Sequence, residues 1–220
     1  MEKESKDPRE KTISTAVINR LPRYYRYLAD LKDAGVERIS SSELAEMLGI
    51  TASQIRQDFN CFGGFGQQGY GYSVPRLYEH IASILGVNEG YRAVIVGTGN
   101  LGRALASSPV FRKRGVTLEA LFDVSPSLVG QTFCGFSILG MEEFEDYVAE
   151  HRPDIAVLTV PRAVTREVAE RIDRAGIRGV WNFTNIELHL AHATVQNIHL
   201  GDTLMTLCYD LREKSGKAGE

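Results

Sequence analysis

The chain has 220 residues, of which 43% are hydrophobic, a length and composition that suit one large or two small folded domains. Its formal net charge of -3 gives no overall sign of nucleic-acid binding, so any DNA contact must come from a local basic patch. No apolar run reaches the roughly 18 residues of a membrane helix, and the charged N-terminus has no apolar segment behind it. These features predict a cytoplasmic protein without a membrane partner. Its three cysteines match no metal-ligand spacing, so no metal site is predicted.

The first part of the chain is predicted to be mainly helical. Apolar residues at helical spacing predict a helix over 18–31, and Gly35 is typical of the position just past a helix end. The glycine-rich residues 63–72 carry alternating aromatic side chains and predict a tight hairpin. A helix over 78–85 completes this part. Residues 85–90 indicate the end of one unit and a short linker.

Two short helices within this part fit a helix-turn-helix motif. The first is predicted over 44–48, with Ser42 as a weak N-cap and Gly49 as its terminator. The second is predicted over 51–62, is capped by Thr51, and would enter the major groove of DNA. Its polar side chains that can reach bases or phosphates are Gln54, Arg56 and Gln57. The alternative is a small helical unit for packing or dimerisation, because short helix pairs are common.

The second part alternates apolar, β-rich runs with amphipathic helices. Strands are predicted at 93–96, 118–122, 155–160, 180–182 and 195–200, and helices at 101–111, 142–150, 165–175 and 202–214. This order is typical of a parallel sheet with crossover helices, so the predicted fold class is α/β with a doubly wound sheet.

A glycine motif at 97–102 follows the first of these strands and opens a helix. Gly97 would make the tight turn, Gly99 would let the backbone approach a pyrophosphate, and Gly102 would let helix and strand pack closely. Exposed amide groups and the helix dipole then favour phosphate binding. A glycine turn without a ligand is the alternative, but strand, spacing and helix all agree with a dinucleotide site.

The predicted cofactor is NAD(H). Asp123 ends the next strand, where a carboxylate can accept hydrogen bonds from ribose hydroxyls and would repel a 2′-phosphate. No Lys or Arg occurs between Arg114 and His151, so the basic clamp for NADP(H) is missing from this stretch. Residues 159–161 and 182–184 end two later strands and are expected near the nicotinamide, with ordinary loop residues as the alternative for each segment. The predicted cofactor-binding residues are Gly97, Thr98, Gly99, Asn100, Leu101, Gly102, Asp123, Val124, Thr159, Val160, Pro161, Asn182 and Phe183.

An NAD-dependent oxidoreductase is the main functional alternative. The sequence argues against it, because only one helix is predicted after the last strand and no substrate domain follows the cofactor domain. The five histidines form no evident acid-base pair with a carboxylate near the nicotinamide end. A CoA-type nucleotide module is a weaker alternative, which Asp123 disfavours. No catalytic residue is therefore predicted.

Together these segments resemble the Rex family of redox-sensing transcriptional repressors of bacteria. The resemblance covers residues 18–211 and rests on the segments 20–28, 41–44, 54–56, 62–72, 97–102, 122–123, 158–161 and 182–183. It implies a winged-helix domain over 1–86, a Rossmann domain over 87–200 and a C-terminal helix over 201–220 that is exchanged between the subunits of a homodimer. It also implies that NAD+ permits binding to palindromic operator DNA and that NADH releases the operator.

The DNA-binding residues that the motif and the resemblance predict are Arg20, Arg23, Ser41, Ser42, Thr51, Ala52, Gln54, Arg56, Gln57, Gly66, Gln67, Gln68 and Tyr70. The family usually has a basic residue at Gln57 and a basic pair at 67–68. Since glutamine reads adenine best, the operator preference is expected to shift. The resemblance also implies a switch between Arg26 of the first helix and an acid near the last strand, where this chain has His199.

Overall fold

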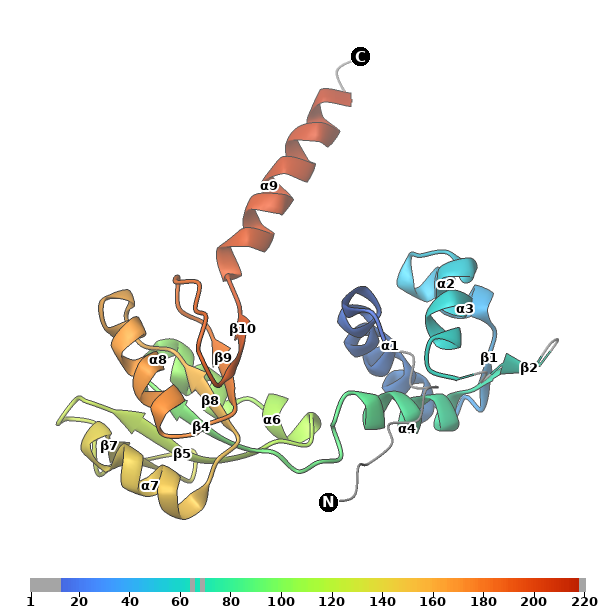
Figure 1. Ribbon diagram of the computed structural model, residues 1–220. Helices are drawn as coiled ribbons and strands as arrows, with labels where there is room; N and C mark the ends of the chain where they lie inside the picture. Colours follow the sequence, from blue (N-terminus) through green and yellow to red (C-terminus); the bar gives the residue numbers. More distant parts are fainter. Residues whose placement is uncertain (1–12, 64–65, 68–69, 218–220) are drawn as a thin grey trace. The chain divides into compact units, whose positions relative to one another are not determined.

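The computed structural model describes residues 13–63, 66–67 and 70–217. The chain divides into two compact units, Met1–Asn88 and Glu89–Glu220. Figure 1 labels most of the helices and strands of each unit.

The first unit combines four helices with a small sheet. Its elements in chain order are α1 (Thr15–Asp33), β1 (Arg38–Ile39), α2 (Ser41–Leu48), α3 (Ala52–Asn60), β2 (Gly66–Gln67), β3 (Gly71–Ser73) and α4 (Val74–Ile84). The predicted hairpin is confirmed: β2 pairs antiparallel with β3, with Gly66 opposite Tyr72. β1, which the sequence analysis missed, pairs with the other side of β3. The helix predicted over 78–85 begins earlier, at Val74.

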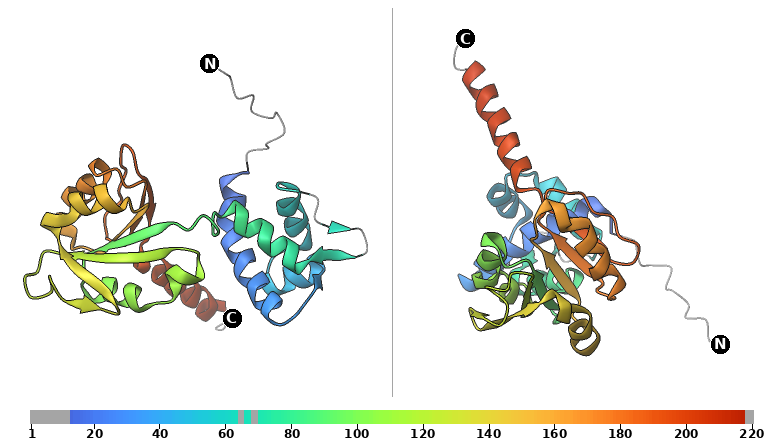
Figure 2. Two further views of the ribbon diagram at one scale, coloured as in Figure 1. Left: turned by 90° about the horizontal axis from the view of Figure 1, so that it is seen from below. Right: turned by 90° about the vertical axis from the view of Figure 1, so that its left-hand side faces the viewer.

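The core of the first unit forms where α1 and α4 pack against each other (Figure 2). Tyr25 of α1 stacks on Tyr78 of α4 with ring centroids 4.6 Å apart, and the two hydroxyls share a hydrogen bond of 2.6 Å. Phe59 of α3 meets Tyr24 and Tyr72 edge to face, at 5.3 and 5.0 Å. These aromatic contacts fix α3 on the helical core and on the hairpin.

The first helix of the helix-turn-helix begins with a capping box, and the expected cap at Ser42 is wrong. Ser40 is the N-cap: its hydroxyl accepts from Glu43 N at 3.1 Å, and Glu43 accepts from Ser40 N at 2.8 Å. The Ser-x-x-Glu spacing that predicts such a box starts two residues before Ser42. Gly49 ends α2 in the left-handed conformation, at φ 63°, as predicted.

The second unit is an α/β sheet of seven strands. Its elements are β4 (Arg92–Val96), α5 (Asn100–Ser107), α6 (Val110–Lys113), β5 (Thr117–Asp123), β6 (Thr132–Phe133), β7 (Phe136–Gly140), η1 (Met141–Glu143), α7 (Phe144–His151), β8 (Ile155–Leu158), η2 (Arg162–Val164), α8 (Thr165–Arg174), β9 (Gly179–Asn182), β10 (Thr194–Asn197) and α9 (Leu200–Lys217). The strand order is β10-β9-β8-β4-β5-β7-β6, parallel except for β6. The predicted doubly wound class is confirmed.

The central strand β4 bears on function because the strand order reverses there. The chain passes from β4 to β5 on one side and later places β8 on the other. Val94 and Val96 join the core under α7 and α8, whereas Ala93 and Ile95 join the core under α5 and α6. Ligands of such sheets bind outside the strand ends at this reversal, which is where the glycine loop follows β4.

Several predicted boundaries are corrected. The helix predicted over 101–111 is two helices, because Pro109 lacks an N–H and holds Ser108 extended at ψ 143°. The strand predicted to reach 160 ends at Leu158, and the one predicted over 195–200 ends at Asn197. β6 and β7 were missed, because their short runs carry little alternation.

The C-terminal helix α9 follows β10 as an isolated helix (Figure 1). Its described side chains are all exposed, including large apolar ones. Within the part of the chain that the structure describes, none of the helices combines the length and apolarity needed to cross a membrane.

Candidate functional site

The glycine loop after β4 has three glycines with three different surroundings. Gly97 has φ +98°, and a Cβ there would lie 2.8 Å from the carbonyl oxygen of Thr159. A Cβ on Gly102 would lie 2.0 Å from the carbonyl oxygen of Gly97. A Cβ on Gly99 would meet nothing within 4 Å. The fold itself therefore requires Gly97 and Gly102, whereas the bare backbone at Gly99 opens toward free space.

A pair of residues that we call the Thr98–Asp123 clasp joins this loop to the end of β5. The Thr98 backbone N–H and hydroxyl both donate to Asp123 Oδ2, at 2.6 and 2.5 Å, and Ser125 N donates to Oδ1 at 2.9 Å. Desolvation raises the pKa of Asp123, but these hydrogen bonds and one from Val124 N outweigh it, so the pKa lies below its usual value. The carboxylate is therefore ionised at neutral pH, as a ribose acceptor should be.

A cavity of about 180 Å³, which we call the Asp123 cavity, opens beside the clasp. It is lined by Val96, Gly97, Phe122, Asp123, Val124, Met141, Val160, Pro161, Val164, Glu167, Val168 and Arg171. Val124 and Val164 are 79% and 40% exposed, unusually open for large apolar side chains. Apolar walls next to a carboxylate suit a flat base joined to a ribose. The structure thus brings together five of the predicted cofactor residues.

The predicted nicotinamide group does not assemble as one pocket. Val160 and Pro161 line the same cavity as Asp123, so they lie at the expected adenosine end. Phe183 packs on Trp181 at 4.6 Å, in the core on the opposite face of the sheet. Asn182 is fully buried, and its amide is occupied by Ile186, Asn197 and Thr184. Its role in this structure is to tie the ends of β9 and β10.

Arg171 is a basic residue near Asp123 that the sequence analysis missed. No basic residue lies close to Asp123 in the sequence, but α8 brings Arg171 to the same cavity from further along the chain. Its Nε and Nη2 donate to the two carboxylate oxygens of Glu145 at 2.8 and 2.7 Å, and Nη2 also donates to Met141 O at 2.7 Å. The Glu145 carboxylate thus already pairs with this guanidinium.

The predicted recognition helix α3 is capped and largely exposed. Thr51 is its N-cap, as predicted, and accepts from Gln54 N at 3.2 Å. Arg56 and Gln57 are exposed. Arg56 donates to the hydroxyls of Ser41 and Ser53, both at 3.1 Å. Arg56 therefore links α3 to the start of α2 while its guanidinium stays at the surface.

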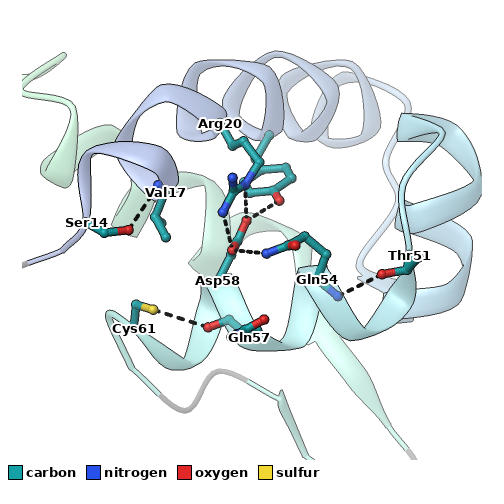
Figure 3. A network of polar contacts seen from close by, with 9 residues as sticks. Ser14, Val17, Arg20, Thr51, Gln54, Gln57, Asp58 and Cys61 are labelled. Atoms are coloured by element: carbon teal, nitrogen blue, oxygen red, sulfur yellow. Dashed lines mark hydrogen bonds and ion pairs between the residues drawn. The ribbon is translucent and has the colours of Figure 1, made fainter.

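Asp58 on α3 organises a buried polar network, which we call the Asp58 network (Figure 3). Its carboxylate is 1% exposed and accepts four hydrogen bonds: two from Arg20 at 2.7 Å, one from Tyr24 at 2.5 Å and one from Gln54 at 2.8 Å. Desolvation raises the pKa of Asp58, but the donors outweigh it and hold the pKa low. Burial raises the pKa of Tyr24 well above its usual value.

The Asp58 network changes the expected roles of two predicted DNA contacts. Arg20 and Gln54 both direct donors at Asp58 rather than only outward. Arg23 donates to the carbonyl of Leu48, the last residue of α2. These side chains therefore connect α1, α2 and α3, and they set the orientation of the helix-turn-helix.

The hairpin β2–β3, which we call the wing, has a basic neighbour that the sequence analysis missed. Tyr70 is 70% exposed, and Arg38 of β1 donates to its carbonyl at 3.2 Å while lying 5.9 Å from its ring centroid. The pairing of β1 with β3 places Arg38 there. The predicted contact Gln68 lies outside the described residues, and of Gly66 and Gln67 the structure describes the strand alone.

The two predicted switch residues have different local contacts. Arg26 of α1 is exposed and lies 5.8 Å from the ring centroid of Tyr27. His199 immediately precedes α9, and its Nε2 lies 3.7 Å from Glu187 Oε2. The histidine therefore sits against a carboxylate, at the point where β10 gives way to α9.

A capped helix-turn-helix with a wing, joined in one chain to a parallel sheet with a glycine loop and an ionised acid, defines a DNA-binding regulator that responds to a nucleotide ligand. Residues 12–60 match the family model described as "Putative DNA-binding protein N-terminus", and residues 88–186 match the model described as "CoA binding domain". The second match agrees with the sheet, which CoA-type modules share.

Similarity to curated proteins extends over nearly the whole chain. The redox-sensing transcriptional repressor Rex of Clostridioides difficile (strain 630) is 49% identical over 204 residues, which cover 92% of this chain and 97% of that protein. Rex of Caldicellulosiruptor bescii is 51% identical over 207 residues, covering 94% and 95%. The chain belongs to the Rex family of redox-sensing transcriptional repressors. The expectation of a regulator rather than an oxidoreductase is thereby confirmed.

Solved structures of RSP, a Rex-family repressor, share the fold. The crystal structure of RSP with β-NAD+ and operator DNA has a TM-score of 0.87 and 45% identity, covering 94% of this chain and 96% of RSP. The crystal structure of RSP with β-NADH has a TM-score of 0.86 and 42% identity, covering 94% and 98%.

Proposed function

We propose that this repressor binds a palindromic operator through α3 and the wing, and that NADH bound in the second unit releases the operator. The protein then reports the NADH/NAD+ ratio to transcription. RSP, whose fold it shares, has been crystallised with NAD+ and operator DNA and with NADH. The residues of this chain that would hold the dinucleotide are the glycine loop, the Thr98–Asp123 clasp and the walls of the Asp123 cavity.

The observation that carries the cofactor assignment is the free space above Gly99. The fold gives no reason for a glycine there, since a Cβ would meet nothing within 4 Å. The residue is also not held at a positive φ: its φ is -67°. A bare backbone at the start of a helix is what a pyrophosphate needs for close approach to the amide groups.

A Gly99→Ala variant tests this assignment. We expect NADH affinity, measured by fluorescence titration, to fall by about tenfold or more, because the methyl group blocks the backbone approach. The melting temperature should stay unchanged, because the methyl group meets no protein atom. Ala104→Ser, one heavy atom added on the exposed face of the same helix, is the matched control and should bind NADH normally. Unchanged NADH affinity in Gly99→Ala would contradict the assignment.

The DNA side is tested by operator selection from random duplexes in the presence of NAD+ or NADH. We expect a palindrome with half-sites one helical turn apart, recovered with NAD+ and depleted with NADH. A gel-shift titration of the selected site then measures release. If NADH fails to release the site at concentrations where NAD+ has no effect, the sensor proposal is wrong.

We also propose that Gln57 alters the base preference. It is exposed on α3, and a glutamine pairs best with adenine, whereas a basic residue pairs with guanine. Selection with a Gln57→Lys variant should return sites enriched in guanine at one symmetric pair of positions. Identical selected sites for both proteins would show that Gln57 does not contact bases.

The homodimer and the three-domain division, with residues 201–220 as an exchanged helix, remain proposals, as does a cytoplasmic location. The support for the homodimer and the exchanged helix is α9, where Leu200, Leu204, Met205, Leu207, Tyr209 and Leu211 are 51–66% exposed. A helix with this much open apolar surface is stable only when a partner covers it. Leu204→Asp should convert a dimer to a monomer in analytical ultracentrifugation, and a variant that remains dimeric would refute the exchanged helix.

The switch residues Arg26 and His199 are proposed on the family resemblance alone. An imidazole never carries a negative charge, so His199 cannot replace an acid as the ion-pair partner of an arginine, and this chain should release its operator less completely than relatives that carry the acid. His199→Asp should strengthen the response to NADH in the gel-shift titration. If His199→Asp responds like the parent protein, residue 199 is not part of the switch.

A further inference from the structure

Arg171 poses a question about cofactor choice, since it is the one basic side chain among the described residues that line the Asp123 cavity. A guanidinium next to the ribose acceptor would ordinarily favour NADP(H), because arginine pairs strongly with a phosphate. The preference for NAD(H) was predicted because no basic residue lies near Asp123 in the sequence. The Asp123 cavity nevertheless contains a basic side chain, that of Arg171. What matters is whether Arg171 can turn its donors toward a ligand.

Glu145 restricts the direction of these donors by geometry. Its two carboxylate oxygens accept from Nε and Nη2 of Arg171, at 2.8 and 2.7 Å, which is a two-point pairing that fixes the plane of the guanidinium. The carbonyl of Met141 accepts a third bond, from Nη2 at 2.7 Å. Two of the three guanidinium nitrogens are thus engaged on the side of α7 and η1.

The charges point the same way. Asp123 and Glu167 also line the cavity, and Glu145 pairs with Arg171, so three carboxylates accompany one guanidinium at this site. A 2′-phosphate adds a charge of about -2 at neutral pH. In this surrounding it meets net repulsion, although Arg171 is close by.

Stability alone does not account for the Glu145–Arg171 pair. The side chains of Arg171 and Glu145 are 28% and 51% exposed. Ion pairs as exposed as this contribute little to stability. The pair has a larger consequence for binding, because Arg171 lines the cavity and Glu145 sets the direction of its donors.

We propose that Glu145 is a specificity-determining residue, which holds Arg171 away from the 2′ position of the cofactor and so excludes NADP(H) together with Asp123. Glu145 is a positioning residue that acts through Arg171. This inference rests on the proposed function, because it assumes that the Asp123 cavity receives the adenosine end of NAD(H).

The test compares NADPH and NADH affinities by fluorescence titration in the full-length protein. Glu145→Gln should raise the affinity for NADPH relative to NADH by about fivefold, the equivalent of one surface charge pair. In an Asp123→Ala background the same change should raise it further, since Glu167 is then the one acid left among the described residues that line the cavity. Glu170→Gln, an exposed glutamate on α8, the helix of Arg171, is the control for loss of one nearby carboxylate and should leave the ratio unchanged.

A second variant separates this mechanism from a general loss of negative charge. Adding Arg171→Met to Glu145→Gln should abolish the gain, and a gain that persists would overturn the proposal. An unchanged NADPH/NADH ratio in Glu145→Gln, in both backgrounds, would overturn it as well. A purely structural pair would change the melting temperature without changing the ratio. Failure of the parent protein to bind NADH would instead contradict the proposed function.

Discussion

Asp58 in the first unit and Asp123 in the second are both carboxylates held by short hydrogen bonds, but their partners differ in kind. Asp58 accepts four hydrogen bonds from three side chains, one of them a cation, and is 1% exposed. Asp123 accepts from a hydroxyl and backbone N–H groups, and it lines an open cavity. Among the described residues no Lys or Arg pairs with it.

The difference indicates what each acid can do. A carboxylate has about four acceptor sites, and both acids accept about four hydrogen bonds from the protein, so the difference lies in access and charge. Asp58 is buried, and its charge is balanced by Arg20 and fixes the helix-turn-helix. Asp123 is held by uncharged donors and lines a cavity, so its negative charge faces that cavity. One acid builds the fold and the other presents a charge to a ligand.

The largest effect is expected from Asp58→Asn, which breaks the first half of this comparison. It leaves Arg20 without an anion, which should cost about 3 kcal/mol, the low end for a broken buried ion pair because Arg20 is 33% exposed. Urea unfolding followed by circular dichroism should show the loss. Trp181 is the single tryptophan and lies in the second unit, so the unfolding transition followed by its fluorescence should be the same as in the parent protein.

Asp30→Asn, exposed on the same helix α1 as Arg20, is the matched control and should unfold like the parent. Operator binding by Asp58→Asn should fall as well, because α3 loses its tie to α1. A parent-like circular dichroism transition in Asp58→Asn would show that the Asp58 network does not hold the first unit together.

Asp123→Ala tests the ligand-binding role proposed for the second acid. We expect NADH affinity to fall about tenfold, through loss of hydrogen bonds to a charged acceptor, and discrimination against NADPH to decrease. The effect should fall on binding more than on folding, the reverse of Asp58→Asn. Titrations that give parent-like affinities for both cofactors would refute the ribose-acceptor role.

Smaller changes sharpen the comparison, because they remove one donor from each acid. Tyr24→Phe deletes the hydroxyl that donates to Asp58 at 2.5 Å, and Thr98→Val deletes the one that donates to Asp123 at 2.5 Å. Each should cost about 1 kcal/mol, in unfolding free energy for Tyr24→Phe and in NADH binding for Thr98→Val. The two acids are functionally alike if both variants affect the same property.

Acid should produce the smallest effect. The ordinary pKa of Asp58 is 3.8, and hydrogen bonds lower it in the folded protein. Stabilisation from a depressed pKa is complete above about pH 4 and is lost as the pH falls through the folded value. The free energy of unfolding, followed by circular dichroism, should therefore drop more steeply below pH 3.8 for the parent protein than for Asp58→Asn. Equal slopes would mean that Asp58 does not contribute to the acid transition.

Patterns local in sequence predicted well. The glycine spacing of 97–102, the cap at Thr51, the terminator Gly49 and the wing hairpin depend on neighbouring residues, and each was found from the sequence. The Ser40 capping box was equally local and was overlooked. The strand β1 is too short to show a pattern.

Contacts between distant residues could not be predicted. Arg171 and Asp123 share a cavity only because one face of α8 lies beside the end of β5. Likewise, the sequence predicted that Gln54 contacts DNA bases, whereas in the structure its amide donates a hydrogen bond to Asp58, as Arg20 does. A polar residue on a helix has several faces within reach, and only packing decides which one it uses.

The Thr98–Asp123 clasp has a consequence for how a ratio can be measured. Its hydrogen bonds join protein groups to one another, so in the proposed site the adenosine end would bind without reorganisation of the loop. NAD+ and NADH are identical at that end, and both gain the same free energy there. The affinity that NAD+ and NADH share at the adenosine end keeps the site occupied by one or the other. A difference in affinity elsewhere in the site decides which of the two is bound. Occupancy by NADH then follows the proportion of the two molecules rather than the size of their pool.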